Sequence, residues 1–260
     1  MAPCRPAMGC QAMSALTLND IGHAFLGRTV LDRVTLDIGE GELVALVGPS
    51  GCGKSTLLHI AAGLVEPRHG RINRTYVRHA VVFQEPRLLP WATARKNIGM
   101  ALPERLSVRD RHDRILSAAA AAALEGEDLD KYPVQLSGGM KQRTAIARAL
   151  ASEADFLFFD EPFTALDPAL RRHMQDIVIG HVGSGKRGGL FITHDMAEAV
   201  RIAHRVVALD RRGNGISGKR HISLMPGERD ERMVFETVQH FMKQDPLFRH
   251  VEELDERRAG

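Results

Sequence analysis

Nine consecutive residues have the composition and spacing of a phosphate-binding loop. The sequence GPSGCGKST comprises Gly48, Pro49, Ser50, Gly51, Cys52, Gly53, Lys54, Ser55 and Thr56. Glycines free backbone N–H groups to surround phosphate oxygens, the lysine meets the β- and γ-phosphates, and the following hydroxyl is a ligand for Mg²⁺. The apolar run ELVALVG precedes the loop, and the helical pattern KSTLLHIAAGL ends near Gly63. A glycine-rich turn that arose by chance would not be expected between a buried strand and a helix. We therefore predict a P-loop with Lys54 as a catalytic residue and Ser55 as a metal ligand.

Two adjacent carboxylates end a second apolar run, FLFFDEP. Asp160 and Glu161 therefore stand at the edge of an open α/β sheet where ligands bind. Asp160 suits an outer or water-mediated partner of Mg²⁺, and Glu161 suits the catalytic base that orients an attacking water. The competing interpretation is a plain strand end that leads into a turn at Pro162.

Gln84 and His194 each follow a strand-like run, VVF and FIT respectively. A carboxamide at position 84 could contact both the metal and the water, and a neutral imidazole at position 194 could bond the γ-phosphate. Taken alone, position 84 is better explained by an ordinary solvated glutamine, and position 194 by a core or surface histidine. Because Gly48 and Asp160 also lie at strand ends, we expect these side chains to meet at one rim of the sheet.

A second glycine-rich segment, LSGGMKQR, opens another helical pattern at Leu136–Arg143. Its Ser137, Gly138 and Gly139 have the backbone freedom to hold an anion at a helix N-terminus. We call it the signature segment. Nothing else in the chain suggests a second nucleotide, so this segment requires its own explanation.

Together, the P-loop, Gln84, the signature segment, FLFFDEP, the tripeptide ALD and His194 resemble the nucleotide-binding subunit of an ATP-binding cassette (ABC) transporter. The resemblance extends from about Leu16 to Arg211. In that family two cassettes pack head to tail, and each ATP lies between one P-loop and the partner's signature segment. A two-fold dimer presents both patches reciprocally, so one chain needs both. The resemblance further implies that Asp167 of ALD communicates with the opposite site and that Phe25 stacks on the adenine, although Phe25 fits a core position equally well.

The surrounding elements predict an α/β fold. Residues 16–38 alternate in polarity, which indicates short antiparallel strands, and the strands and helices after residue 150 alternate as in a mostly parallel sheet. Residues of about 90–150 contain helix formers and a possible cap at Ser107, with Asp110 three residues on. We expect a P-loop NTPase core, an N-terminal antiparallel β-subdomain and a helical insertion, which is the ABC ATPase fold, over residues 16–260. Residues 1–15 are expected to form a disordered tail.

The composition indicates a globular protein and gives no sign of membrane-spanning segments or of a required nucleic-acid partner. The chain of 260 residues is 44% hydrophobic and 26% charged, which is globular, and its net charge of +3 does not require a nucleic-acid partner. No apolar run approaches the ~20 residues of a membrane span, so a role at a membrane would need a partner. The cysteines Cys4, Cys10 and Cys52 form no paired framework, which favours a reducing cytoplasm.

The stretch VFQEPRLLPW, followed by NIG, is similar to importer ATPases of the nitrate, sulfonate and taurine group. This resemblance implies ATP and Mg²⁺ as cofactors, a homodimer, an integral-membrane permease, an indirect periplasmic solute-binding partner and a peripheral place on the cytoplasmic face of the inner membrane. Trp91 in this stretch either packs within the insertion or contacts the permease. The same motifs also fit a subunit for a different solute or for export. A soluble ABC ATPase acting on nucleic acid or ribosomes would instead have tandem cassettes or a basic coiled insertion.

Overall fold

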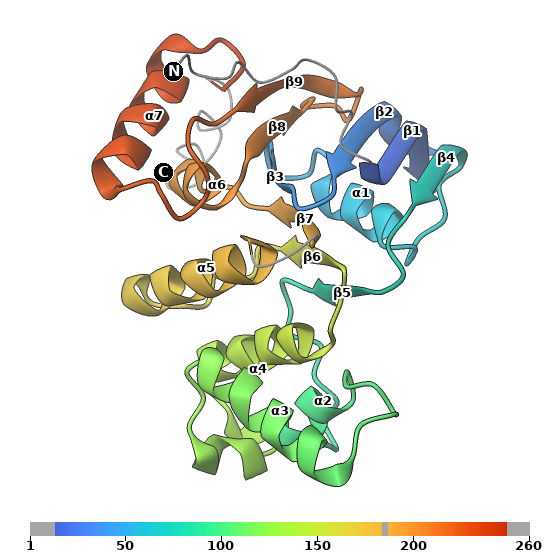
Figure 1. The fold of residues 1–260 in the computed structure, drawn as a ribbon. Helices are drawn as coiled ribbons and strands as arrows, with labels where there is room; N and C mark the ends of the chain where they lie inside the picture. The colour runs from blue at the N-terminus through green and yellow to red at the C-terminus, as the bar shows by residue number, and fades with distance from the viewer. Residues whose placement is uncertain (1–13, 184–186, 249–260) are drawn as a thin grey trace, which may run out of the picture.

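A small antiparallel sheet forms the N-terminal part of the fold (Figure 1). The computed structural model describes residues 14–183 and 187–248. The sheet has the strand order β2-β1-β4, with β1 at Ser14–Phe25, β2 at Arg28–Gly39 and β4 at His69–Arg74. The sequence predicted short strands here, but β1 and β2 have 12 residues each and pair through several bulges.

The larger sheet has the strand order β5-β6-β7-β3-β8-β9. Its first five strands are parallel and β9 is antiparallel, which confirms the predicted α/β fold with a mostly parallel sheet. The strands are β3 (Leu43–Val47), β5 (His79–Val82), β6 (Phe156–Asp160), β7 (Gly188–Ile192), β8 (Arg205–Leu209) and β9 (Ile216–His221). Because β5, β6, β7 and β3 are parallel neighbours, the residues after each of them meet at one edge.

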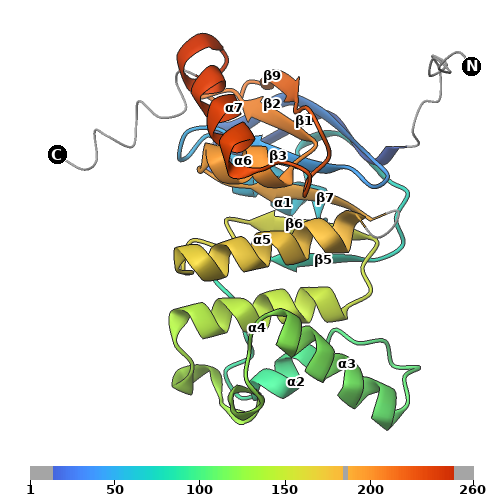
Figure 2. The same ribbon diagram turned by 60° about the vertical axis from the view of Figure 1, so that its left-hand side comes forward.

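Apolar side chains bury both faces of this sheet. On one face, Val44 and Leu46 join a core with helix α1 (Lys54–Ala61) and the antiparallel sheet, so α1 lies between the two sheets. On the other face, Ala45 and Val47 share a core with α5 (Pro168–Gly183), α6 (Met196–Ile202) and α7 (Glu231–Gln244), as Figure 2 shows. The P-loop between β3 and α1 is therefore held by elements that are packed on two sides.

The segment between β5 and β6 forms a separate helical lobe below the sheets in Figures 1 and 2. The lobe contains α2 (Ala94–Gly99), α3 (Val108–Ala121), the short 3₁₀ helices η1 (Gly126–Asp130) and η2 (Pro133–Gln135), and α4 (Gly138–Ala151). Ser107 caps α3, because its hydroxyl accepts the Asp110 N–H at 3.1 Å and donates to the Asp110 carboxylate at 2.7 Å. The lobe occupies the position of the predicted helical insertion.

Two boundaries and one strand differ from the sequence prediction. Strand β1 begins at Ser14, two residues before the expected start of the domain, and the rest of the predicted tail lies outside the described residues. Helix α1 ends at Ala61, because Gly63 is in the left-handed region with φ 77°. Strand β4 was not predicted, since none of its side chains is fully buried and it shows no apolar alternation. No helix in the described ranges has the length and apolar character needed to cross a membrane.

Candidate active site

The P-loop is built around the ammonium group of Lys54. This group donates to the carbonyl oxygens of Gly48 at 2.7 Å and Pro49 at 3.0 Å, and the residue is only 7% exposed. Gly53 has φ 101°, and a Cβ there would lie 2.8 Å from the Leu31 side chain. Only glycine avoids both the backbone strain and the collision, so the shape of the loop depends on this residue.

Asp160 ends β6 directly behind the P-loop. Its carboxylate accepts the Ser55 hydroxyl at 3.0 Å, and the Nε2 atom of His59 lies 3.9 Å from its other oxygen. Burial raises the pKa of the Asp160 carboxyl, while the Ser55 hydrogen bond and His59 oppose the rise. A hydroxyl and a carboxylate are oxygen ligands of the kind that Mg²⁺ prefers. Among the described residues, no group of three or more His, Cys, Asp or Glu side chains is arranged to hold a metal ion by itself.

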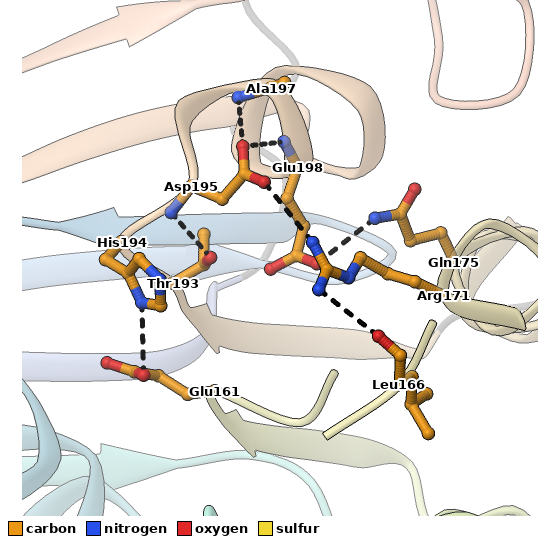
Figure 3. Close-up of polar contacts among 9 residues, drawn as sticks. All are labelled: Glu161, Leu166, Arg171, Gln175, Thr193, His194, Asp195, Ala197 and Glu198. Carbon is orange, nitrogen blue, oxygen red and sulfur yellow. Dashed lines mark hydrogen bonds and ion pairs between the residues drawn. The ribbon is translucent and has the colours of Figure 1, made fainter. Parts of the chain in front are cut away.

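Glu161 and His194 approach each other across the ends of the neighbouring strands β6 and β7. The Nδ1 atom of His194 lies 3.2 Å from a carboxylate oxygen of Glu161 (Figure 3). Glu161 has φ 45°, an unusual conformation for a residue with a side chain, and its N–H donates to the Ile192 carbonyl at 3.0 Å. Such backbone strain costs on the order of 1 kcal/mol and is concentrated at functional sites, where the surrounding structure fixes it.

Lys54, Ser55, Glu161 and His194 line one pocket of about 510 Å³. Its walls are Phe25, Val30, Ser50, Gly51, Gly53, Lys54, Ser55, Thr56, Gln84, Glu161 and His194. Phe25 is 51% exposed and its ring packs edge-on against His23, which excludes a position for Phe25 in the core. Gly48, Cys52 and Asp160 are buried behind the wall. The structure thus brings together residues from segments far apart in the sequence, at the rim that the sequence predicted.

The signature segment and Asp167 do not line this pocket. The Ser137 hydroxyl accepts the Met140 N–H at 3.2 Å at the start of α4, and Ser137 and Gly138 are exposed while Gly139 is half-buried. Asp167 is also exposed and accepts the Leu170 N–H at 3.0 Å at the start of α5. Within the described chain, the signature segment therefore belongs to a different surface.

Several residues around the site had no signal in the sequence. Val30 lines the pocket from β2. From α4, the Gln142 amide donates to the Phe83 carbonyl at 3.2 Å, and Arg148 donates to the Pro86 carbonyl at 3.0 Å. Both contacts hold the segment that carries Gln84 against the helical lobe. Their residue types are ordinary for a helix, and only the fold shows which carbonyls they reach.

Comparisons with known proteins agree with this geometry. Residues 31–164 match the family model described as ABC transporter. The chain is 42% identical over 211 residues to the aliphatic sulfonates import ATP-binding protein SsuB 1 of Pseudomonas syringae pv. syringae, covering 80% of this chain and 86% of the relative. It is 41% identical over 208 residues to a Brucella abortus protein whose name states only ATP binding, covering 76% and 78%.

A solved structure extends the comparison to the fold. The ATP-binding cassette MJ0796, in a dimeric post-hydrolysis state bound to ADP and phosphate, superposes with a TM-score of 0.74 at 27% identity. The match covers 81% of this chain and 100% of that chain. The P-loop pocket, the paired acids after β6 and the cassette fold all occur together here, and this chain therefore belongs to the ABC transporter family as an ATP-binding, ATP-hydrolysing subunit.

Proposed function

We propose that this chain powers an importer of small organic anions of the aliphatic sulfonate class. The proposal is supported by the relatives named as sulfonate importers at about 40% identity over most of both chains. We further propose that the subunit attaches to the cytoplasmic face of the inner membrane through a separate permease, and that a periplasmic solute-binding protein delivers the solute.

In the proposed reaction, Lys54 holds the β- and γ-phosphates of ATP, and Glu161 orients the attacking water and accepts its proton. His194, 3.2 Å from Glu161, would hold this carboxylate and bond the γ-phosphate. Ser55, Gln84 and Asp160 are the residues that would hold Mg²⁺, directly or through water. Bound there, the ion would neutralise the charge that develops on the phosphates.

The remaining phosphate contacts come from a second copy of the chain in this proposal. Ser137, Gly138 and Gly139 lie outside the P-loop pocket and stand at the N-terminus of a 14-residue helix, where backbone N–H groups favour an anion. Asp167 of one copy would lie near the opposite site. The dimeric assembly of the structurally similar cassette MJ0796 supports this arrangement.

The surface beside α2 is the proposed contact with the permease. Trp91, just before α2, is 74% exposed, and Met100, just after it, is also exposed. This exposure argues against packing of Trp91 within the lobe. The segment that carries Gln84 continues to Leu89, whose N–H donates to the Asn97 side chain of α2 at 2.8 Å, so a change at the nucleotide could be passed to this surface along the segment.

Growth of a deletion strain tests the proposed solute class. Loss of the gene should abolish growth on an aliphatic sulfonate as the sole sulfur source and spare growth on sulfate. The wild-type gene should restore growth, and Glu161→Gln should not, because hydrolysis would be lost. Normal growth of the deletion strain on unsubstituted alkanesulfonates, with a defect instead on taurine as the sulfur source or on nitrate as the nitrogen source, would reassign the solute.

A further inference from the structure

We infer that Arg171 is a positioning residue for His194, which it holds through Asp195 at a fixed place relative to the segment that follows Glu161. The inference rests on the proposed role of His194 in hydrolysis. Arg171 lies in the first turn of α5, outside the nucleotide pocket, and it contacts the two segments that carry the Glu161–His194 pair (Figure 3).

The guanidinium group of Arg171 makes two contacts. It donates to the Leu166 carbonyl at 3.3 Å, in the segment that runs from Glu161 to Asp167, and its other terminal nitrogen lies 3.9 Å from an Asp195 carboxylate oxygen. Arg171 thus bridges the chain after β6 to the chain after β7. The spacing between Glu161 and His194 depends on the same two segments.

Asp195 is suited to transmit this contact to its neighbour His194. One of its carboxylate oxygens accepts the N–H groups of Ala197 at 2.8 Å and Glu198 at 3.1 Å and so caps α6. The other oxygen is the one that faces Arg171. The Asp195 N–H also donates to the Thr193 hydroxyl at 3.0 Å. His194 is therefore flanked on both sides by residues with fixed positions.

A second contact from α5 supports the same turn. Gln175, one helical turn after Arg171, donates to the Glu198 carboxylate at 3.1 Å, and Glu198 is only 6% exposed. Burial raises the pKa of Glu198, and hydrogen bonds from Thr193 and Gln175 oppose the rise. Glu198 also hydrogen-bonds the Thr193 side chain, so a second residue of α5 supports the turn that carries His194.

A purely structural role in packing α5 against α6 is the competing explanation. It predicts loss of thermal stability with unchanged kcat per folded molecule. A positioning role predicts a fall in kcat with little change in KM or melting temperature, because Arg171 does not touch the nucleotide pocket.

A double-mutant cycle on the full-length chain distinguishes the positioning role of Arg171 from a purely structural role. Arg171→Met keeps the length of the side chain without its charge, and Asp195→Asn keeps a good helix cap without its charge. Each should lower kcat for ATP about tenfold, since displacing a catalytic group by a fraction of an ångström has effects of this size. The double variant should be no slower than the slower single variant, because both changes remove the same Arg171–Asp195 contact.

The matched control is Arg172→Met, since Arg172 is the next residue on α5 and pairs with Glu231 of α7. The kcat of this control should stay at the wild-type value.

His194→Ala completes the design. It should abolish most turnover, and Arg171→Met should add no further loss to its residual rate. Wild-type kcat in Arg171→Met, rate losses that multiply in the double variant, or a melting temperature that falls in step with kcat would overturn the inference and leave the role of His194 intact. A wild-type rate in His194→Ala would instead contradict the proposed site itself, and the inference with it.

Discussion

At the scale of single residues, Lys54 combines two roles in one side chain. Its ammonium group is buried within the P-loop and bonds two loop carbonyls, so it helps to shape the loop that it serves. In a site with little water, a fixed positive charge interacts strongly with developing negative charge on phosphate. Binding and turnover should therefore depend strongly on this residue.

Lys54→Ala is expected to abolish ATP turnover and to weaken nucleotide binding strongly, because it removes the charge on the β- and γ-phosphates. Titration with a fluorescent ATP analogue and a phosphate-release assay measure the two effects. Lys219→Ala, at an exposed position of β9, is the matched control and should leave both unchanged. Undiminished turnover in Lys54→Ala would contradict the assignment of the P-loop.

The buried carboxyl of Glu198 gives a prediction about pH. Burial raises its pKa in the folded chain, so its contribution to stability is present below the unfolded pKa and is lost as the pH rises through the raised folded pKa. Glu198→Gln cannot ionise, and we expect it to melt at a higher temperature than the wild type at neutral pH, with the difference shrinking in acid. Scanning calorimetry across this pH range measures it. A Gln variant that is less stable than the wild type at neutral pH would show that Glu198 is stabilised as a carboxylate.

At the scale of elements, the sequence predicted those strands and helices whose motifs or periodicity are strong. The buried run of β6 and the capped start of α3 were found because apolar residues and the Ser107 cap mark them. Strand β4 was not predicted because its side chains are exposed or half-buried. Its backbone pairing with β1 defines it as a strand. The contact of Arg171 with Asp195 was also beyond prediction, since the two arginines of α5, Arg171 and Arg172, are equivalent until the fold gives each its partner.

At the scale of elements, the prediction concerns Trp91 in the exposed loop before α2, where we propose that the permease binds. Trp91→Ala should change the melting temperature by no more than about 2 °C, because exposed side chains contribute little to stability. It should weaken association with the permease by about thirtyfold or more, the loss typical of an aromatic interface anchor. Co-purification with the permease and calorimetry of the free subunit provide the two readouts, and Phe235→Ala on α7 is a matched exposed aromatic control. Normal association, or a large drop in melting temperature, would place the permease contact elsewhere on the lobe.

At the scale of the whole molecule, the central claim is that the catalytic site is shared between two copies. The sequence predicted two phosphate-binding segments, and in the structure these segments do not line the same pocket of one chain. The residue types suggest a reciprocal arrangement of two copies. The structure of a single chain does not include it, because the P-loop of one copy would face the signature segment of the other. A test must therefore measure assembly rather than any property of the single subunit.

Sedimentation velocity of the Glu161→Gln variant with Mg²⁺ and ATP is the most direct test. The variant should bind ATP without hydrolysing it, so it should accumulate as a dimer at high protein concentration and remain a monomer without nucleotide. Adding Ser137→Arg should abolish the dimer while leaving ATP binding to the P-loop intact, because Ser137 lies outside the pocket. A Glu161→Gln chain that stays monomeric at saturating ATP, or a dimer that persists with Ser137→Arg, would contradict the shared site.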